Sequence, residues 1–186
     1  MKYTKLISSL FFAGLLLSGC GSSGGGNSSA QTGSSSAATT HQTTVVTTNG
    51  EIIPVKVTTE GFIFGGYEGK PVVLEFYGDT CPHCINAIPM YNNFQAKYGS
   101  EILILTIESY GKLNNAGLQG YAASKNIQYR TVSKENSGNI KAYAEGLVGP
   151  MAGVPYVIVI NKNGVISSRK LVPSEAQLQA DILDVL

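Results

Sequence analysis

One stretch of the sequence, residues 72–89, most constrains what this chain can fold into. It reads V-V-L-E-F-Y-G-D-T-C-P-H-C-I-N-A-I-P, and its apolar start is broken only by Glu75. A continuous apolar run of this kind is typical of a central strand that is covered on both faces. The proline after the first cysteine suits the first turn of a helix, where its missing N–H has no intrahelical partner. We therefore predict a buried strand over residues 71–76, a short turn, and a helix over residues 82–98.

The two cysteines of this stretch lie where the turn becomes the helix. Cys81 and Cys84 are separated by two residues, so they fall within one helical turn and can close a disulfide between themselves. A thiol is a nucleophile only as the thiolate, and the positive end of a helix favours that anion. The position and spacing of the two cysteines therefore favour thiol–disulfide redox chemistry.

Two other uses of a C-x-x-C motif fit this chain less well. A structural zinc site needs about four ligands, and the remaining candidates are Cys20, His41 and His83. His83 lies between the two cysteines and is poorly placed to join them on one ion, so we expect no metal. Covalent haem attachment needs a histidine directly after the second cysteine, where this chain has Ile85. We expect no cofactor other than a redox-active disulfide.

The first twenty residues have the pattern of a secretory signal. Lys2 and Lys5 flank the start of an apolar run that is too short to span a bilayer comfortably, and the segment ends in L-S-G-C at Cys20. This ending resembles the lipobox of bacterial lipoproteins, in which the cysteine is acylated and becomes the first mature residue. The resemblance implies a lipoprotein signal peptide over residues 1–19 and a lipid on Cys20. A plain signal peptide with an incidental cysteine is the alternative.

A lipid on Cys20 would hold the protein outside the cytoplasm, at the periplasmic face of a bacterial membrane. Gly21 is not the aspartate that marks many Gram-negative lipoproteins for the inner membrane, which favours the outer membrane in such a cell. Charge is nearly balanced, with 13 basic and 12 acidic residues and no basic patch, so we expect no nucleic-acid partner.

Residues 20–50 are almost entirely small or polar. Such a segment cannot bury enough apolar surface to offset the entropy of ordering it. We therefore expect a disordered tether that begins at the lipidated cysteine, with a folded domain over residues 51–186. His41, which lies in this tether, is expected to be a solvated loop residue.

The folded part alternates apolar and polar segments that predict strands and helices. Expected strands cover residues 53–59, 62–64, 71–76, 101–108, 129–132, 154–160 and 165–170, and expected helices cover 82–98, 116–125, 137–145 and 174–186. Alternating strands and helices require parallel neighbours, and the Asn163-Gly164 turn adds an antiparallel hairpin. We predict a three-layer α/β/α sandwich with a mixed central sheet, in which Ser137 and Ser174 cap the last two helices.

The sequence resembles the thioredoxin superfamily in two separated motifs. The first is V-L-E-F-Y-G-D-T-C-P-H-C over residues 73–84, and the second is A-Y-A-E-G followed by G-V-P-Y-V-I-V-I-N-K-N-G. The wider frame, with Y-E-G-K-P-V-V-L-E-F and Pro89, is similar to the TlpA/ResA-like branch of bacterial lipoprotein thiol–disulfide oxidoreductases. The C-P-H-C motif is similar to that of the DsbA-type disulfide oxidases. The resemblance covers residues 51–186 and implies a thioredoxin-like fold.

The resemblance also implies roles for individual residues. Cys81 would be the exposed nucleophile, Cys84 the buried resolving thiol, and Glu75 the proton acceptor for the second cysteine. Redox tuning would fall to the two residues between the cysteines, Pro82 and His83. Substrate docking would fall to Val154 and Pro155, which in this superfamily are joined by a cis peptide bond.

One departure bears on the proton acceptor. Many TlpA-like proteins have a glutamate in the helix three residues after the second cysteine, where this chain has Ala87. Any role of that helical acid therefore falls to Glu75 alone.

These features predict an enzyme that exchanges disulfides with thiol- or disulfide-bearing proteins and is recycled by a redox partner. The direction is open, because C-P-H-C favours disulfide donation while the TlpA-like frame favours reduction, for example in cytochrome c maturation. We expect a monomer, anchored in the membrane only through its lipid. The alternative is a copper or haem-delivery chaperone that uses the two thiols as soft ligands.

Overall fold

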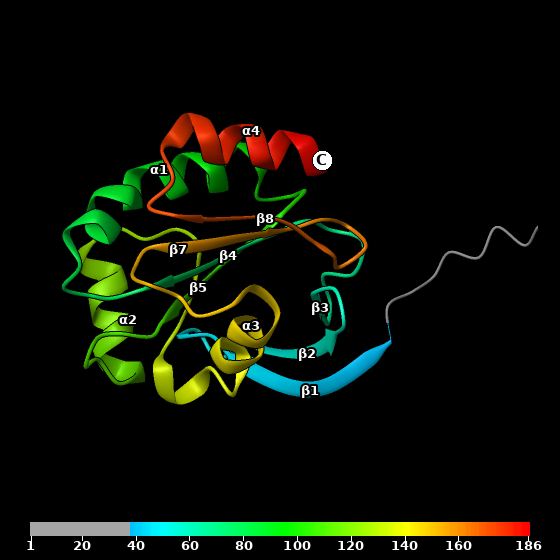
Figure 1. The fold of residues 1–186 in the computed structure, drawn as a ribbon. Coiled ribbons are helices and arrows are strands. Elements are labelled where there is room, and N and C mark those ends of the chain that lie inside the picture. The colour runs from blue at the N-terminus through cyan, green and yellow to red at the C-terminus, as the bar shows by residue number, and fades with distance from the viewer. Residues whose placement is uncertain (1–37) are drawn as a thin grey trace, which may run out of the picture. The chain divides into compact units, whose positions relative to one another are not determined.

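The computed structural model describes residues 38–186. The elements alternate along the chain and are drawn in Figure 1. They are β1 (Thr39–Val46), β2 (Ile52–Thr58), β3 (Phe62–Phe64), β4 (Val72–Tyr77), α1 (Pro82–Tyr98), β5 (Leu103–Glu108), α2 (Asn115–Ser124), β6 (Arg130–Val132), the 3-10 turn η1 (Lys134–Asn136), α3 (Ile140–Val148), β7 (Tyr156–Ile160), β8 (Ile166–Leu171) and α4 (Glu175–Val185).

The central sheet has five strands in the order β6-β5-β4-β7-β8. The β4 strand is parallel to β5, which is parallel to β6, while β7 is antiparallel to both β4 and β8. All six residues of β4 are buried, as expected for a middle strand with layers on both faces. The mixed sheet predicted from the sequence is confirmed, and β4 brings the cysteine motif to its carboxyl end.

Helices α1 and α4 lie together on one face of this sheet (Figure 1). Their apolar residues, including Phe94 and Ile182, pack on Val73, Ile104 and Val157 of the sheet. The opposite face carries α3 and a second, three-stranded antiparallel sheet in the order β1-β2-β3. The three-layer architecture is therefore confirmed, with one outer layer built partly of strands.

The predicted start of the folded domain is wrong. We expected a disordered tether to residue 50, but β1 begins at Thr39 and pairs antiparallel with β2. Val45 in this strand is fully buried, and the ring of His41 stacks on Tyr143 of α3 at 4.9 Å, so His41 does not lie in a loop. Threonine and valine favour strands. The polar composition of β1 does not indicate a buried face, because that face forms only when β1 pairs with β2. The predicted signal peptide and Cys20 lie outside the described residues.

The two predicted serine caps differ in outcome. Ser174 caps α4 as predicted, because its hydroxyl accepts a hydrogen bond from Gln177 N at 3.3 Å and Gln177 Oε1 returns one to Ser174 N at 2.9 Å. The prediction for Ser137 is wrong, because α3 begins at Ile140. The Ser137 hydroxyl instead donates to Lys134 O at 2.8 Å and so closes the 3-10 turn.

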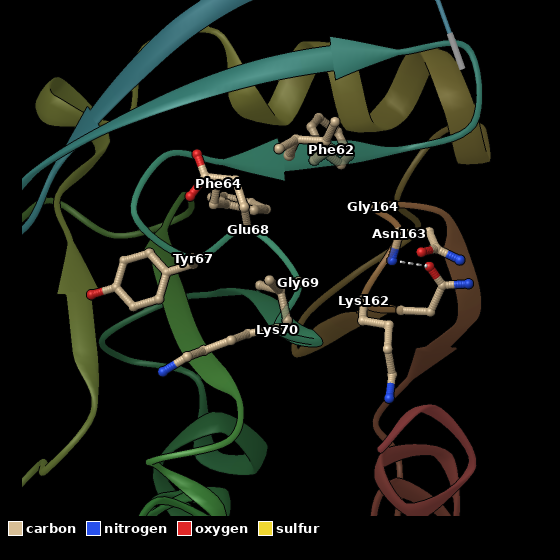
Figure 2. A pocket seen from close by; sticks show the side chains of 12 residues that line it. Phe62, Phe64, Tyr67, Glu68, Gly69, Lys70, Lys162, Asn163 and Gly164 are labelled. Atoms are coloured by element: carbon tan, nitrogen blue, oxygen red, sulfur yellow. Dashed lines mark hydrogen bonds between the residues drawn. The ribbon is translucent and has the colours of Figure 1, made fainter. Parts of the chain in front are cut away.

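The Asn163-Gly164 turn connects β7 to β8 as predicted, and it also contacts the small sheet. Gly164 has a left-handed backbone, with φ of 81°, and its carbonyl oxygen accepts a hydrogen bond from Phe62 N at 2.8 Å. Figure 2 shows the pocket of about 170 Å³ between these two segments, lined by Phe64, Tyr67 and Lys162 among others. Val72, at the start of β4, lines this pocket. The pocket therefore lies at the opposite end of β4 from the cysteines.

Within residues 38–186, no helix combines the length and the hydropathy that crossing a bilayer requires.

Candidate active site

Cys81 is the N-cap residue of α1. The β4 strand ends at Tyr77, three residues turn the chain, and Pro82 opens the helix, as the sequence predicted. The Cys81 Sγ accepts a hydrogen bond from the backbone N–H of Cys84 at 3.3 Å, the position that a capping oxygen normally occupies. The Cys81 sulfur therefore lies at the positive end of the helix dipole.

Cys84 lies one turn further into the helix and is only 4% exposed. It packs against Tyr77 of β4 and Leu118 of α2, whereas Cys81 remains partly accessible. Burial raises the pKa of the Cys84 thiol, and its contact with the Cys81 sulfur adds to that rise. One cysteine is therefore open to a partner and the other is a shielded thiol that holds its proton.

Glu75 lies in the middle of β4 and is only 2% exposed. Burial raises the pKa of its carboxyl group to about 8, and the nearby Tyr91 hydroxyl only partly offsets this effect. Neither Glu75 Oε1 nor the Tyr91 hydroxyl makes a hydrogen bond of normal length and angle to a described residue. Glu75 is close enough to Cys84 for its charge to raise the pKa of that thiol further. The predicted buried acid is thus present beside the inner cysteine.

The second motif meets the first at the cysteines. Val154 and Pro155 are joined by a cis peptide bond, as the resemblance implied. The Cys81 S–H donates to the carbonyl oxygen of Val154 at 3.5 Å, and the Val154 side chain packs on the cluster around Cys84. Two segments that are far apart in the sequence therefore form one site.

The remaining predicted residues lie at its edge. Pro82 and His83 are exposed in the first turn of α1, where a histidine could act on the outer sulfur. Among residues 38–186, no group of three or more His, Cys, Asp or Glu side chains is arranged to hold a metal ion.

Comparison with known proteins identifies the family. The sequence profile described as Redoxin matches residues 60–186, which is more than half of the chain. The chain belongs to the Redoxin family. It is accordingly a thiol–disulfide oxidoreductase with a thioredoxin-like fold.

Solved structures similar to this redoxin share its fold. A thioredoxin-family thiol:disulfide interchange protein from Chlorobium tepidum has a TM-score of 0.61 and 18% identity, over 80% of this chain and 96% of that one. The exposed lipoprotein thioredoxin of Streptococcus pneumoniae gives 0.60 and 14%, over 77% and 99%. A secreted disulfide oxidoreductase of Mycobacterium tuberculosis gives 0.53 and 16%, over 76% and 95%. A search of curated proteins gave no match.

The redoxin site contains a second buried acid that the sequence analysis missed. Glu108 ends β5, is fully buried, and lies beside Tyr77 in the parallel register of β4 and β5. Its Oε1 accepts a hydrogen bond from Gly111 N, while its Oε2 has no partner among the described residues. The signal was visible in the sequence, because Glu108 closes the apolar run I-L-I-L-T-I-E just as Glu75 interrupts V-V-L-E-F-Y.

The sequence analysis also missed an apolar rim around the redoxin cysteines, formed by Tyr110, Leu171 and Val172, all exposed. A Cβ atom on Gly78 would lie 3.4 Å from Tyr110 Cβ and 3.9 Å from Cys81 Cβ, so Tyr110 and Cys81 both lie beside Gly78. Val172 donates its N–H to Pro155 O at 2.9 Å, and Leu171 lies beside Gly153, directly before Val154. Three of the five exposed large apolar side chains in the described part of the chain therefore surround this site.

The rim includes a residue with an unusual backbone. Val172 has φ of 49°, in the left-handed region that β-branched residues rarely adopt. Backbone outliers of this kind cluster at functional sites, where the surrounding structure holds them in place. Here the hydrogen bond to Pro155 O holds Val172 beside the Val154-Pro155 loop.

Proposed function

We propose that this chain exchanges disulfides with partner proteins, with Cys81 as the nucleophile and Cys84 as the resolving thiol. The observation that carries the proposal is the asymmetry of the two sulfurs. Cys81 Sγ is accessible, faces the Cys84 N–H at 3.3 Å and lies against Val154 O, whereas Cys84 is almost fully buried.

The reaction can be written with its atoms and electrons balanced. The Cys81 thiolate attacks one sulfur of a partner disulfide, and the other partner sulfur leaves as a thiolate that takes up a proton. Cys84 then loses its proton and attacks Cys81 Sγ, which releases the second partner sulfur and forms the Cys81–Cys84 disulfide. The protein is oxidised by two electrons and the partner disulfide is reduced to two thiols. The reverse sequence donates a disulfide.

Glu75 is the proposed proton acceptor for Cys84. The inner thiol cannot attack until it loses its proton, and its raised pKa makes that loss unfavourable without a base. A carboxyl group whose pKa lies near 8 can both accept and return a proton near neutral pH, unlike an ordinary glutamate. The pairing of a buried thiol with a buried acid supports this role.

The partner chain is proposed to dock beside Val154. An extended peptide could pair with the backbone of this loop as an added strand, which would place its cysteine against Cys81 Sγ. The apolar rim of Tyr110, Leu171 and Val172 would contact side chains on either side of that cysteine. This arrangement suits an extended protein segment better than a small thiol.

The proposed location is outside the cytoplasm, with the chain anchored by a lipid on Cys20. The L-S-G-C ending supports this, and a similarly folded protein from Streptococcus pneumoniae is described as an exposed lipoprotein. A separate redox protein would recycle the Cys81–Cys84 pair.

The deciding experiment is the redox potential of the folded domain against glutathione, together with the same measurement on His83→Ala. A strongly oxidising potential supports disulfide donation, and a thioredoxin-like potential supports reduction. Replacing His83 should make the couple more reducing, because the side chain proposed to tune the Cys81–Cys84 pair is lost. Absence of any exchange with glutathione, or stoichiometric Cu(I) binding without redox turnover, would contradict the proposed function.

A further inference from the structure

Buried side-chain oxygen atoms without a hydrogen-bond partner are concentrated near the active site. Seven buried side-chain oxygen atoms lack a hydrogen-bond partner among the described residues. Native proteins leave few such groups unsatisfied, so a concentration of them needs an explanation. Five of the seven belong to residues in or beside the layer between the central sheet and α1: Glu75, Tyr77, Asp79, Tyr91 and Glu108.

These groups follow one another along the sheet. Glu75 and Tyr77 are two residues apart on β4, so their side chains project from the same face. Tyr77 is the register partner of Glu108 on the neighbouring parallel strand, at a spacing of about 4.8 Å between strands. The Tyr77 side chain therefore lies between the two buried acids. Consistent with this, the charges of both Glu75 and Glu108 raise the pKa of Tyr77, after the larger effect of burial.

A third acid completes the series at Gly111. A Cβ atom on Gly111 would clash with both Asp79 Oδ1 and Glu108 Oε1, so the two carboxyl groups meet over this glycine. Their oxygens lie within about 4.3 Å of each other, close enough for the Asp79 carboxylate to raise the pKa of Glu108. Asp79 is only partly buried, whereas Glu108 is fully buried. The pair therefore connects the protein interior to solvent.

The charged and polar groups around Glu108 come from several elements. Burial is the main cause that raises the pKa of its carboxyl group, and Asp79 raises it further. The backbone N–H groups of Gly111 and Tyr110 and the ammonium of Lys134 on η1 lower it.

The inner acid has its own set of neighbours. Besides Tyr77 on its own strand, Glu75 faces the Tyr91 hydroxyl and the Cys84 thiol of α1. Its charge also raises the pKa of Tyr129, which precedes β6, and of Tyr121 on α2. Among residues 38–186, burial and the Tyr91 hydroxyl are the causes that act on the pKa of Glu75, and no basic side chain is one of them. A proton on Glu75 could therefore move next to a tyrosine hydroxyl, and from there to the Asp79–Glu108 pair.

We propose that Glu108, paired with Asp79 across Gly111, is a positioning residue that passes the Cys84 proton between Glu75 and solvent. The inference rests on the proposed disulfide exchange and adds its proton route. When Cys84 is oxidised, its proton moves from Sγ to a Glu75 oxygen, then through the Tyr77 hydroxyl and bridging water to the Asp79–Glu108 pair, and out to solvent at Asp79. When Cys84 is reduced, one proton returns by the same groups. No electrons move along this route.

The test uses Glu108→Gln in the full chain, with Glu101→Gln as a control at an exposed acid. Reduced protein is mixed with oxidised glutathione, quenched with acid at successive times, and analysed by mass spectrometry to separate the mixed disulfide from the closed disulfide. Glu108→Gln should slow closure of the Cys81–Cys84 disulfide about 10-fold at pH 7, since a lost proton-transfer group reduces rates by at least that factor. Formation of the mixed disulfide should be unchanged.

Two further readouts separate proton transfer from a structural effect. The pH dependence of closure should change in Glu108→Gln, and high concentrations of imidazole should restore the rate. Asp79→Asn, at a side chain that is only partly buried, should show the same defect more weakly even if Glu108→Gln folds poorly. An unchanged pH profile in Asp79→Asn, or a slow closure that imidazole does not restore, would overturn the proposal. A wild-type chain that never forms a mixed disulfide would instead refute the proposed function itself.

Discussion

The Cys81 sulfur lies 3.5 Å from the carbonyl oxygen of Val154, 73 residues further along the chain. The contact joins the two segments on which the proposed reaction depends, the nucleophile and the docking loop. Cys84 is almost fully buried, whereas Cys81 is partly accessible. The first prediction concerns this order of the two sulfurs.

Cys84→Ala should trap partner proteins as mixed disulfides on Cys81, because the resolving thiol is gone while the accessible nucleophile remains. Non-reducing gels after incubation with a reduced or oxidised protein substrate measure this directly. Cys81→Ala is the matched control and should trap nothing and turn over nothing. Full turnover by either variant would rule out the proposed mechanism.

Glu75→Gln should stabilise the fold at neutral and alkaline pH. The folded carboxyl has a pKa near 8 against 4.5 in the unfolded chain, so between these values the folded state holds a proton that the unfolded state has lost. Stability of the wild-type protein therefore falls as pH rises from 4.5 to 8, and the glutamine variant escapes this loss. The gain should be absent below pH 4 and reach roughly 4 kcal/mol at pH 8.

Urea unfolding across this pH range measures the effect of Glu75→Gln, and Glu101→Gln at an exposed site provides the control. A stability difference that does not change between pH 4 and pH 8 would contradict the shifted pKa. The same variant should slow closure of the disulfide, which separates the functional cost of losing Glu75 from its structural benefit.

Leu171→Ser should weaken recognition of apolar peptides while sparing small disulfides. Leu171 is 48% exposed at the rim, so its loss removes contact area with a docked chain and leaves the core intact. A reduction in kcat/KM of about 5- to 10-fold is expected for a cysteine peptide with apolar flanks, equivalent to about 1 kcal/mol of lost apolar burial. Turnover of oxidised glutathione should not change.

Leu183→Ser is a close control for the rim, because this leucine is 53% exposed on α4, which is not part of the rim. It should leave both substrates unaffected. Equal losses in the two leucine variants would indicate a general effect of surface leucines and remove the rim from the docking site.

A chain that begins at residue 51 should be markedly less stable than one that begins at residue 38. The shorter chain lacks β1, which buries Val45 and covers one edge of β2. We expect a loss of at least about 3 kcal/mol in the free energy of unfolding, from one buried valine and the newly exposed core around it. Equal unfolding midpoints in urea would show that β1 is dispensable.

Local chemistry explains why the site could be predicted as far as it was. The strand before Cys81, the helix after Pro82 and the cap at Ser174 each depend on residues that are close together in the sequence. The Val154-Pro155 loop was predicted from its resemblance to a known family. Such features can be predicted from the sequence because the residues that form each of them are neighbours in the chain.

The missed features depend on pairing between distant segments. The strand at Thr39 looks like a polar linker until β2 supplies its partner, and Ser137 could have capped a helix that instead begins three residues later. The role proposed for Glu108 depends on the parallel register that places it beside Tyr77, and on the approach of Asp79 to Gly111. None of these relationships can be read from composition or periodicity in one segment.

The early start of β1 shortens the segment between the proposed lipid anchor and the folded domain. If the proposed lipid is on Cys20, only the eighteen residues 21–38 separate it from the first strand, with a contour length of about 60 Å. A tether running to residue 50 would have allowed about 100 Å. The volume that an anchored domain can reach scales with the cube of the tether length. The shorter tether would therefore reach about a fifth of the volume that the longer one would reach. With the lipid proposed on Cys20, the early start of β1 would restrict partners to proteins that lie close to the same membrane.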